Sequence, residues 1–242
     1  GVGSKEIVVR MGKAGLLSFL GTGGVPVPVI EESIQYIQQH LTRNEPYGMN
    51  LLCNVNNPES EDEIVDLYLK YGIRNVEAAA YMTMTPALVR YRLKGLTKEG
   101  INNRIIGKVS RPEVAEAFLQ PAPERIVKKL LEKGAVTSEE AELAKSIPMA
   151  DDITVEADSA GHTDMGVAYV LMPAMRILRD EMMKKYNYRK KVRIGAAGGI
   201  GTPEAAAAAI IMGAEYLVTG SINQCTVEAG TSDIVKDLLQ QI

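Results

Sequence analysis

The sequence is poor in the residues that characterise several protein classes. It has no tryptophan, two phenylalanines, two cysteines and two histidines among 242 residues. Cys53 and Cys225 are too few for a disulfide framework or a four-thiolate zinc site. No apolar run reaches the ~18 residues of a membrane span, and the first residues do not resemble a signal peptide. We therefore expect a cytoplasmic protein that does not contact a membrane.

The charge is close to balanced. The chain has 27 Lys+Arg against 30 Asp+Glu, a formal net charge of −3. A chain without an excess of basic residues has no overall electrostatic attraction for nucleic acid, so we expect no nucleic-acid partner. With 46% hydrophobic and 24% charged residues, the composition is typical of a globular protein and excludes a disordered one.

Short apolar runs alternate with longer amphipathic runs along the whole chain. The short runs predict buried strands, and the longer runs predict covering helices. The predicted strands cover 16–20, 48–53, 73–78, 104–109, 153–157, 192–196 and 216–219, and the predicted helices cover 4–15, 30–41, 60–71, 85–94, 112–119, 168–187, 203–212 and 232–241.

This alternation predicts an α/β protein with a parallel sheet and right-handed crossovers. The chain opens on a helix, so one strand before Gly1 would complete eight βα units. We expect a TIM (β/α)8 barrel over residues 1–242 whose first strand is missing or lies upstream of residue 1. A seven-stranded doubly wound sheet stays open as an alternative.

The alternation is interrupted once, at about 120–150. Two helices without a strand follow each other there, and Thr137 and Glu140 have the spacing of a capping box. We interpret this stretch as a helical insertion. It is a candidate for substrate or carrier contact, or else a stabilising flap without a partner.

Glycine-rich loops follow the last two predicted strands. Glycine allows backbone N–H groups to approach a ligand, and the N-terminus of a following helix favours an anion. The last two strands of a barrel are where many barrels hold a phosphate. The alternative is that the glycines only make tight turns. The candidate phosphate-binding residues are Ala197, Gly198, Gly199, Gly220 and Ser221.

A second polar motif, Glu156-Ala-Asp-Ser-Ala-Gly-His-Thr-Asp164, directly follows a predicted strand. Its side chains should lie at the C-terminal mouth of the barrel. His162 can exchange a proton near neutral pH, although a structural loop histidine is the alternative. The aspartates lack the spacing of a calcium loop, so we expect no metal site. The motif adds Asp158, Ser159 and Gly161 to the candidate cofactor-binding residues.

Two further polar groups lie on other predicted strands. A buried amide at Asn50 needs hydrogen-bond partners, and a buried ammonium at Lys108 needs a negative charge, unless Lys108 lies just past the barrel rim. Together with the loops, these groups suit a phosphorylated planar cofactor across the barrel mouth. We expect flavin mononucleotide (FMN), with its phosphate on Gly199 and Ser221 and its ring near His162.

Three stretches, 156–164, 195–203 and 218–233, resemble the trans-acting enoylreductases of trans-acyltransferase polyketide synthases. They are similar also to the related enzymes of polyunsaturated fatty acid synthases, and both groups belong to the nitronate monooxygenase-like flavoprotein barrels. The resemblance implies bound FMN, NADPH or NADH as reductant, and hydride delivery to the β-carbon of an enoyl thioester on an acyl carrier protein.

The resemblance also implies roles for single residues. His162 matches the family's active-site histidine, so it would position or protonate the substrate. Lys108 would stabilise negative charge on the reduced ring. Asp158 stands where the wider family often has glutamate, and Ala160 replaces a glycine, which argues against nitronate oxidation. The oligomeric state stays open, a homodimer included.

Three other functions compete with enoyl reduction. A nitronate monooxygenase would have the same barrel and flavin but a small substrate. A carrier-protein docking module without activity would bind no flavin. A phosphosugar isomerase barrel would also hold phosphate after its last strands, but without flavin.

Overall fold

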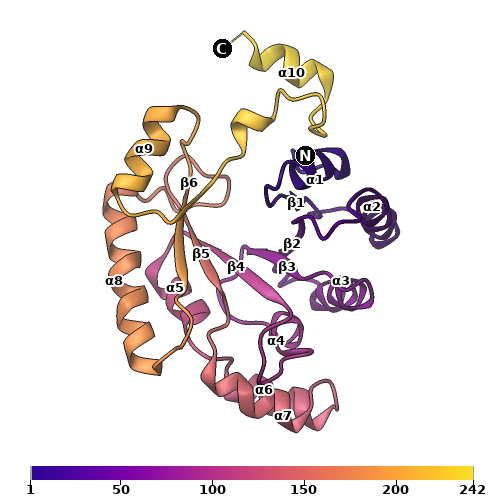
Figure 1. Cartoon of the computed structure of the whole chain (residues 1–242), viewed down its shortest axis with the longest axis vertical. Helices are drawn as coiled ribbons and strands as arrows, with labels where there is room; N and C mark the ends of the chain where they lie inside the picture. The colour runs from indigo at the N-terminus through magenta and orange to yellow at the C-terminus, as the bar shows by residue number, and fades with distance from the viewer. Residues whose placement is uncertain (1, 242) are drawn as a thin grey trace.

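The computed structural model describes residues 2–241, and its centre is one sheet of seven parallel strands (Figure 1). Neighbours in the sheet are neighbours in sequence, in the order β1 to β7. The strands are β1 (Phe19–Leu20), β2 (Gly48–Leu52), β3 (Asn75–Ala79), β4 (Arg104–Val109), β5 (Asp152–Glu156), β6 (Arg193–Ala197) and β7 (Tyr216–Val218).

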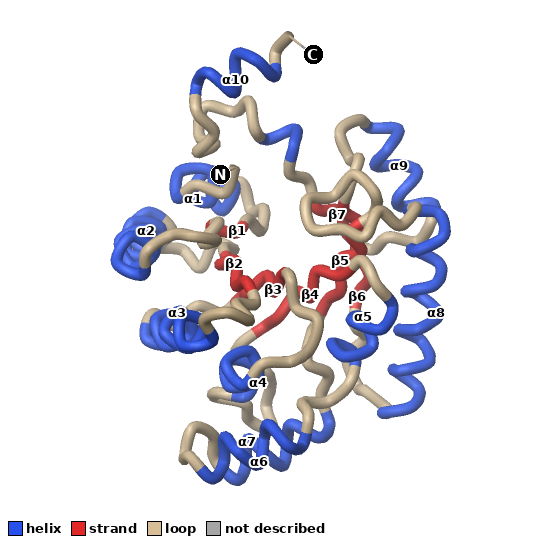
Figure 2. The backbone as a smooth tube through the Cα atoms, turned by 180° about the vertical axis from the view of Figure 1, so that it is seen from behind, coloured by secondary structure: helices blue, strands red, loops and turns tan. Residues whose placement is uncertain are grey.

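Helices connect the strands and cover the outer face of the sheet (Figure 2). The α-helices are α1 (Lys5–Lys13), α2 (Val27–His40), α3 (Pro58–Lys70), α4 (Pro86–Leu93), α5 (Pro112–Leu119), α6 (Glu124–Glu132), α7 (Ser138–Leu143), α8 (Ala168–Tyr186), α9 (Pro203–Ile211) and α10 (Asp233–Leu239). Short 3₁₀-helices, η1 (Ala144–Ser146) and η2 (Ser221–Asn223), complete the described elements.

The sheet curls into a half-barrel with helices outside it (Figure 2). A doubly wound sheet would reverse its strand order at one point, and this sheet does not, so the barrel-like prediction is confirmed. Within residues 2–241, β1 and β7 are the edge strands. Residues before α1 lie along β1, since the N–H of Gly21 donates to the carbonyl oxygen of Gly3 at 2.8 Å. The strand expected before Gly1 lies outside the described residues.

Successive side chains along each strand point to opposite faces of the sheet, so the sequence of a strand determines which residues line each face. In β3, Val76 and Ala78 are fully buried, while Glu77 between them takes the opposite side, inside the curl. In β4, Gly107 faces outward, and a Cβ there would lie 2.9 Å from the ring of Phe118 in α5. The apolar core therefore lies between the sheet and its helices, and polar groups line the concave side.

Most predicted elements agree with the structure to within a few residues. The strand over 104–109 and the helix over 112–119 match β4 and α5, and Ser4 caps α1 by accepting a hydrogen bond from the N–H of Ile7 at 3.1 Å. The strand expected over 16–20 is shorter, because Leu16 and Leu17 are exposed and unpaired with β2. The 3₁₀-helix η2 had no counterpart in the predictions.

The predicted insertion is present as α6, α7 and η1. It joins the end of α5 to the start of β5, so it lies at the amino ends of the strands. Its helix α6 packs against α4, and Glu140 accepts a hydrogen bond from the N–H of Gly95 at 2.7 Å. The insertion is therefore remote from the carboxyl ends of the strands, where barrel enzymes bind substrate. This position favours the stabilising role over direct contact with substrate.

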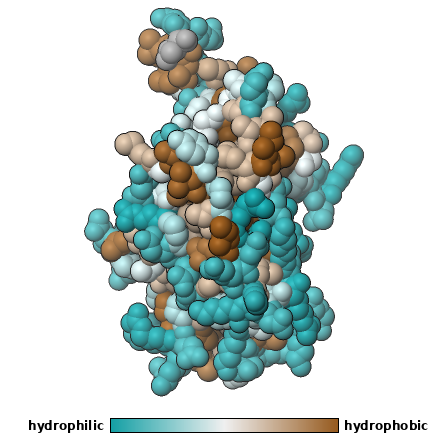
Figure 3. Space-filling view, turned by 90° about the vertical axis from the view of Figure 1, so that its left-hand side faces the viewer, coloured by the Kyte–Doolittle hydropathy of each residue, from teal (hydrophilic) through white to brown (hydrophobic). Residues whose placement is uncertain are grey.

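Several large apolar side chains are exposed on the outer surface of α8 and α9. Apolar patches lie on the face formed by α8 and α9 (Figure 3). No helix in residues 2–241 combines the length and the apolar composition of a membrane span. The exposed apolar side chains on α8 and α9 are Tyr169, Val170, Ile177, Ile210 and Ile211.

Candidate active site at the carboxyl ends of the strands

Parallel strands bring their carboxyl ends to one edge of the sheet, and all the predicted site residues lie at or near this edge. We call this edge, with the loops after β1 to β7, the mouth. Helix caps give the loops a fixed shape. Thr202, for example, accepts a hydrogen bond from the N–H of Ala205 at 3.2 Å and so begins α9 directly after the glycine-rich loop.

The loop after β6 depends on glycine. Gly198 and Gly199 have φ of +97° and +68°, a backbone region that favours glycine. A Cβ at Gly198 would also lie 3.1 Å from the backbone nitrogen of Ala160, in the loop after β5. The two loops therefore pack closely together, and Gly198 and Gly199 do form a tight turn.

The same loops also present free hydrogen-bond donors. Within residues 2–241, the N–H groups of Gly199, Ile200 and Gly220 donate to no acceptor in the chain. The loops after β6 and β7 lie next to each other, since a Cβ at Gly201 would be in ordinary contact with the side chain of Ile222 in η2, at 3.4 Å. Backbone donors beside the N-terminus of a helix are what a phosphate group requires, so this donor set fits the phosphate of FMN.

The loop that carries His162 is anchored at both sides. Thr163 donates its hydroxyl to the carbonyl oxygen of Glu156 at 3.0 Å. Asp164 accepts hydrogen bonds from Ser110 at 2.6 Å and from Nε of Arg111 at 2.8 Å, both after β4. The hydrogen bonds from Arg111 and Ser110 lower the pKa of Asp164 to about 2. Asp164 is thus a loop anchor, and His162 itself is exposed at the mouth.

Lys108 meets the negative charge that its burial requires. Its Nζ lies 2.9 Å from Oε1 of Glu77 in β3 and 3.0 Å from Oε1 of Glu156 in β5. The three side chains are mostly buried, with 18%, 13% and 3% of their surface exposed. Lys108 therefore does not lie past the barrel rim. It is held inside the curl between two carboxylates, on neighbouring strands.

Asn50 also faces the concave side. Its Nδ2 donates to the carbonyl oxygen of Glu77 at 3.4 Å, a long contact that leaves most of its hydrogen-bonding capacity for another partner. Its backbone oxygen accepts hydrogen bonds from Thr22 and Tyr68 at 2.7 and 2.6 Å. The side-chain amide of Asn50 was predicted to need hydrogen-bond partners, and the chain provides it with this one long bond.

The remaining predicted residues divide into two groups. Ala197 is buried at the end of β6, whereas Asp158, Ser159, Gly161 and Ser221 are exposed on the mouth loops. Asp158 accepts a hydrogen bond from Ser159 at 3.3 Å. Over the described residues, no group of three or more His, Cys, Asp or Glu side chains could hold a metal ion.

The backbone is strained at the end of β3. Ala80 has φ of +62°, a left-handed conformation that costs an alanine roughly 1 kcal/mol. Tyr81, the next residue, is buried and donates its hydroxyl to buried Glu61, in the first turn of α3, at 2.7 Å. This anchor explains how the chain holds the strained turn.

We therefore predict that Ala80→Gly raises the free energy of unfolding, by about 0.5–1 kcal/mol, because glycine relieves the strain. Chemical denaturation measures the change. The matched control is Ala79→Gly, one residue earlier in β3, where glycine should destabilise the strand. A lower stability of the Ala80 variant than of the wild type would contradict the account.

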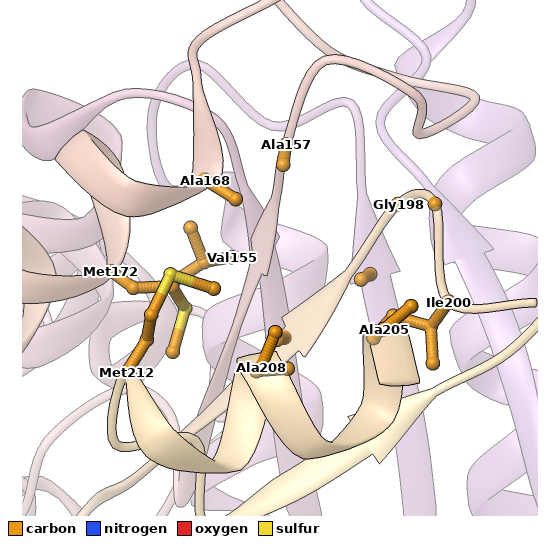
Figure 4. Close-up of a pocket in the computed structure, with 13 residues that line it drawn as sticks. Val155, Ala157, Ala168, Met172, Gly198, Ile200, Ala205, Ala208 and Met212 are labelled. Atoms are coloured by element: carbon orange, nitrogen blue, oxygen red, sulfur yellow. The ribbon is translucent and has the colours of Figure 1, made fainter. Parts of the chain in front are cut away.

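Two hollows lie away from Lys108, and the smaller one reaches the mouth at Gly198, Gly199 and Ile200. One, of about 180 Å³, lies between the outer face of β5 and β6 and the helices α8 and α9 (Figure 4). It is apolar, with Met172 and Met212 side by side (Figure 4). The other, of about 1670 Å³, lies at the amino ends of the strands, beside Arg74 and Arg104. Neither hollow contains His162 or Lys108.

The glutamate partners of Lys108 are the part of the site that sequence reasoning missed. Glu77 and Glu156 were visible as polar residues of two strands, but their meeting at Lys108 was not predicted. The available signal is the alternation: each of the three residues sits on an inward-facing position, Lys108 and Glu156 near the carboxyl ends of their strands and Glu77 in the middle of β3. Arg111, which anchors the His162 loop, had no signal, because it follows a strand as an ordinary surface charge would.

The chain is similar to proteins of polyketide and polyunsaturated fatty acid biosynthesis. No protein-family model matches the chain. The chain is 58% identical to the polyketide biosynthesis protein PksE of Bacillus subtilis (strain 168) over 247 residues, which cover 100% of the chain and 32% of PksE. It is 44% identical to one component of the polyunsaturated fatty acid synthase of Thraustochytrium sp. (strain ATCC 26185 / S-3) over 248 residues, covering 100% of the chain and 16% of that component. The chain thus spans a third or less of these relatives.

Two solved structures share the fold. The crystal structure of the enoyl reductase domain of MlnA, from the macrolactin biosynthesis cluster of Bacillus amyloliquefaciens, matches with a TM-score of 0.94 and 46% identity, over 100% of this chain and 56% of that one. A nitroalkane oxidase from Streptomyces ansochromogenes matches with a TM-score of 0.68 and 17% identity, over 99% of this chain and 67% of that one, and this likeness concerns the fold alone. Over its whole length, the chain is thus homologous to one segment of proteins of polyketide and polyunsaturated fatty acid synthesis, and the enoyl reductase domain of MlnA is among its relatives.

Proposed function

We propose that this chain is the cofactor- and substrate-binding barrel of an enoyl reductase that uses FMN and NADPH or NADH. Its substrate would be an α,β-unsaturated thioester on an acyl carrier protein, in polyketide or fatty acid biosynthesis. The observation that carries the proposal is the match of the whole chain to the enoyl reductase domain of MlnA. The nitroalkane oxidase match is a likeness of fold and favours no second function.

The donor set at the mouth supports FMN as the cofactor. The free N–H groups of Gly199, Ile200 and Gly220 would hold the phosphate, with the hydroxyl of Ser221 beside them. Asn50 offers an amide with spare hydrogen-bonding capacity to the ring. When bound, FMN would supply the hydride chemistry, and the protein would supply orientation and protons.

His162 is the group best placed to handle a proton at the substrate. It is exposed on a loop that Asp164 and Thr163 anchor to the ends of neighbouring strands, so its position is fixed while its ring stays accessible. Reduction of the double bond places negative charge on the thioester oxygen, and donors that stabilise this charge lower the barrier. We assign His162 the role of proton donor to the substrate.

The positive charge of Lys108 is less available to a bound cofactor than that of an unpaired lysine would be. Its charge is already matched by Glu77 and Glu156, so the three groups together carry −1 when all are ionised. The ammonium can stabilise negative charge on the cofactor ring only if one of the two carboxylates is neutral.

The first test of the proposal is the visible spectrum. The purified chain, mixed with FMN and freed of excess by gel filtration, should keep the flavin and lose its colour when NADPH or NADH is added. A chain that retains no flavin would contradict the proposal and favour a docking module without activity. Ser221→Ala and Gly220→Pro, which remove a hydroxyl and a backbone donor, should each weaken flavin retention.

A further inference from the structure

The smaller of the two hollows is an apolar cavity between the sheet and two of its covering helices. It has a volume of about 180 Å³ and lies between the outer face of β5 and β6 and the helices α8 and α9 (Figure 4). All of the described residues that line it are alanine, glycine, valine, isoleucine or methionine. Ordered water needs about two to four polar partners, and these side chains offer no hydrogen-bond donor. The cavity therefore suits an apolar group better than it suits water.

The side of α9 that faces the sheet explains why this space exists. Its cavity-lining residues are spaced at i, i+3, i+4 and i+7, so they share one side of the helix: Ala205, Ala208, Ala209 and Met212. The large apolar residues of α9 lie elsewhere, since Ile210 and Ile211 are 52% and 85% exposed. In α2, by contrast, the side facing the sheet carries the fully buried Ile30, Ile34 and Ile37. The cavity thus follows from the choice of side chains along α9.

Hydrogen bonds at both ends of α9 hold the cavity open. At the start of the helix, Thr202 accepts a hydrogen bond from the N–H of Ala205. At its end, Nη1 of Arg176 in α8 donates to the carbonyl oxygen of Met212 at 3.3 Å. The N–H of Glu215 then donates to the carbonyl oxygen of β6 residue Ile194 at 2.7 Å. With both ends fixed, α9 does not move onto the sheet to fill the space.

The cavity is accessible at one end and adaptable at the other. Its rim at the mouth is the loop Gly198-Gly-Ile200, in which Gly199 is exposed. At the end of α9 farthest from this rim, Met212 lies beside Met172 of α8 (Figure 4). Methionine side chains are flexible and polarizable, so this pair can adjust its shape to the end of an apolar ligand.

We propose that this cavity binds an alkyl chain of about six carbon atoms, which enters at the mouth and ends against Met172 and Met212. An engineered apolar cavity of about 150 Å³ in another protein takes up benzene, which also has six carbon atoms, so the space is sufficient. The alkyl chain can come from the acyl group of the enoyl thioester or from a separate ligand such as a free fatty acid. The first source rests on the proposed function, and the second does not.

Methionine-methyl NMR tests binding on the chain without cofactor or substrate. The chain is isotopically labelled in the methyl groups of its methionines and titrated with hexanol. The signals of Met172 and Met212 should shift, whereas that of Met49, buried in β2, should not. From butanol through pentanol to hexanol, affinity should rise about fourfold with each added methylene, because each one buries further apolar surface.

Ala209→Leu fills the cavity, and Ala207→Leu is the matched control. Ala209 is buried and lines the cavity, whereas Ala207 in the same helix is exposed and does not line it. Hexanol should bind the wild type and Ala207→Leu equally and Ala209→Leu at least about tenfold more weakly. No methionine shift in the wild type, or equal affinity in all three proteins, overturns the proposal. If Ala209→Leu does not fold by circular dichroism, Ala205→Leu fills the cavity from its other end and decides.

Turnover by the FMN-loaded chain separates the two sources of the alkyl chain. If the acyl group occupies the cavity, KM should fall as the enoyl thioester lengthens in the wild type and in Ala207→Leu, and Ala209→Leu should lose this dependence. The same dependence in all three proteins would assign the cavity to a separate ligand. Hexanol binding without any enoyl reduction would reject the proposed function and leave the alkyl site standing. Enoyl reduction without hexanol binding would reject the alkyl site and leave the function standing.

Discussion

Replacing Arg92 with methionine is expected to lower the free energy of unfolding by about 3–5 kcal/mol. The guanidinium is 1% exposed and forms an ion pair with Asp151, which is almost equally buried. It also donates to the carbonyl oxygens of Pro148 at 2.9 Å and Asn103 at 3.0 Å. Methionine would leave a buried carboxylate without its main partner and two carbonyl oxygens unsatisfied. Urea denaturation at pH 7 measures the loss.

Arg90 provides the matched control two residues earlier in α4. It pairs with Asp62 and Asp66, whose side chains are 55% and 68% exposed, so Arg90→Met should cost less than about 1 kcal/mol. Combining Arg92→Met with Asp151→Asn should recover part of the lost stability, because no buried charge is then left alone. Equal losses in the Arg92 and Arg90 variants would contradict this account of the ion pair.

The same pair makes stability depend on pH. Burial opposes ionisation of Asp151, but the charge and hydrogen bond of Arg92 outweigh it and hold the pKa of Asp151 below its usual value. A carboxyl with a lowered pKa stabilises the fold above its ordinary pKa and loses this contribution as the pH falls below it. Acid denaturation of Arg92→Met should therefore begin at a higher pH than that of the wild type.

Replacing His162 with alanine is expected to leave flavin retention intact and to slow enoyl reduction by about 10²–10⁴-fold, the usual contribution of a positioned proton donor. The side chain is exposed on an anchored loop and packs against no core, so its loss should not unfold the protein. Steady-state turnover with an enoyl thioester and NADPH measures the effect, and the flavin spectrum confirms that the cofactor stays bound.

His40→Ala is the control for this experiment. The side chain of His40 lies at the end of α2, with Nδ1 2.8 Å from the carbonyl oxygen of Tyr36, away from the mouth. Its removal should not change turnover. If His162→Ala reduces the thioester as fast as the wild type, His162 is not the proton donor, and the enoyl reductase function itself would need another one.

The sequence was most informative where its signals are local. Ser4 before an amphipathic run predicted the start of α1, and Thr137 with Glu140 predicted the capping box that begins α7. Each signal depends on hydrogen bonds within one turn, so no knowledge of distant contacts is needed. The alternating order of strands and helices also predicted the barrel-like sheet, because each pair of neighbouring parallel strands needs a crossover connection, here a helix.

The sequence was least informative where distant residues meet. Arg92 and Asp151 are 59 positions apart, and nothing near either residue marks it as one half of a buried pair. The same holds for Lys108 and its two glutamates, which belong to separate strands. The strand predicted at Leu16 and Leu17 was wrong. These residues are apolar, but they are exposed and lie outside β1.

Anaerobic stopped-flow spectroscopy tests whether this barrel transfers hydride to an enoyl thioester, as we propose. The FMN-loaded chain is bleached with one equivalent of NADPH and mixed with an enoyl thioester on an acyl carrier protein, with a nitronate, or with buffer alone. We predict that the flavin colour returns fastest with the enoyl thioester, with one saturated thioester formed per flavin. A return of colour no faster than in buffer, or one seen only with the nitronate, would contradict the claim.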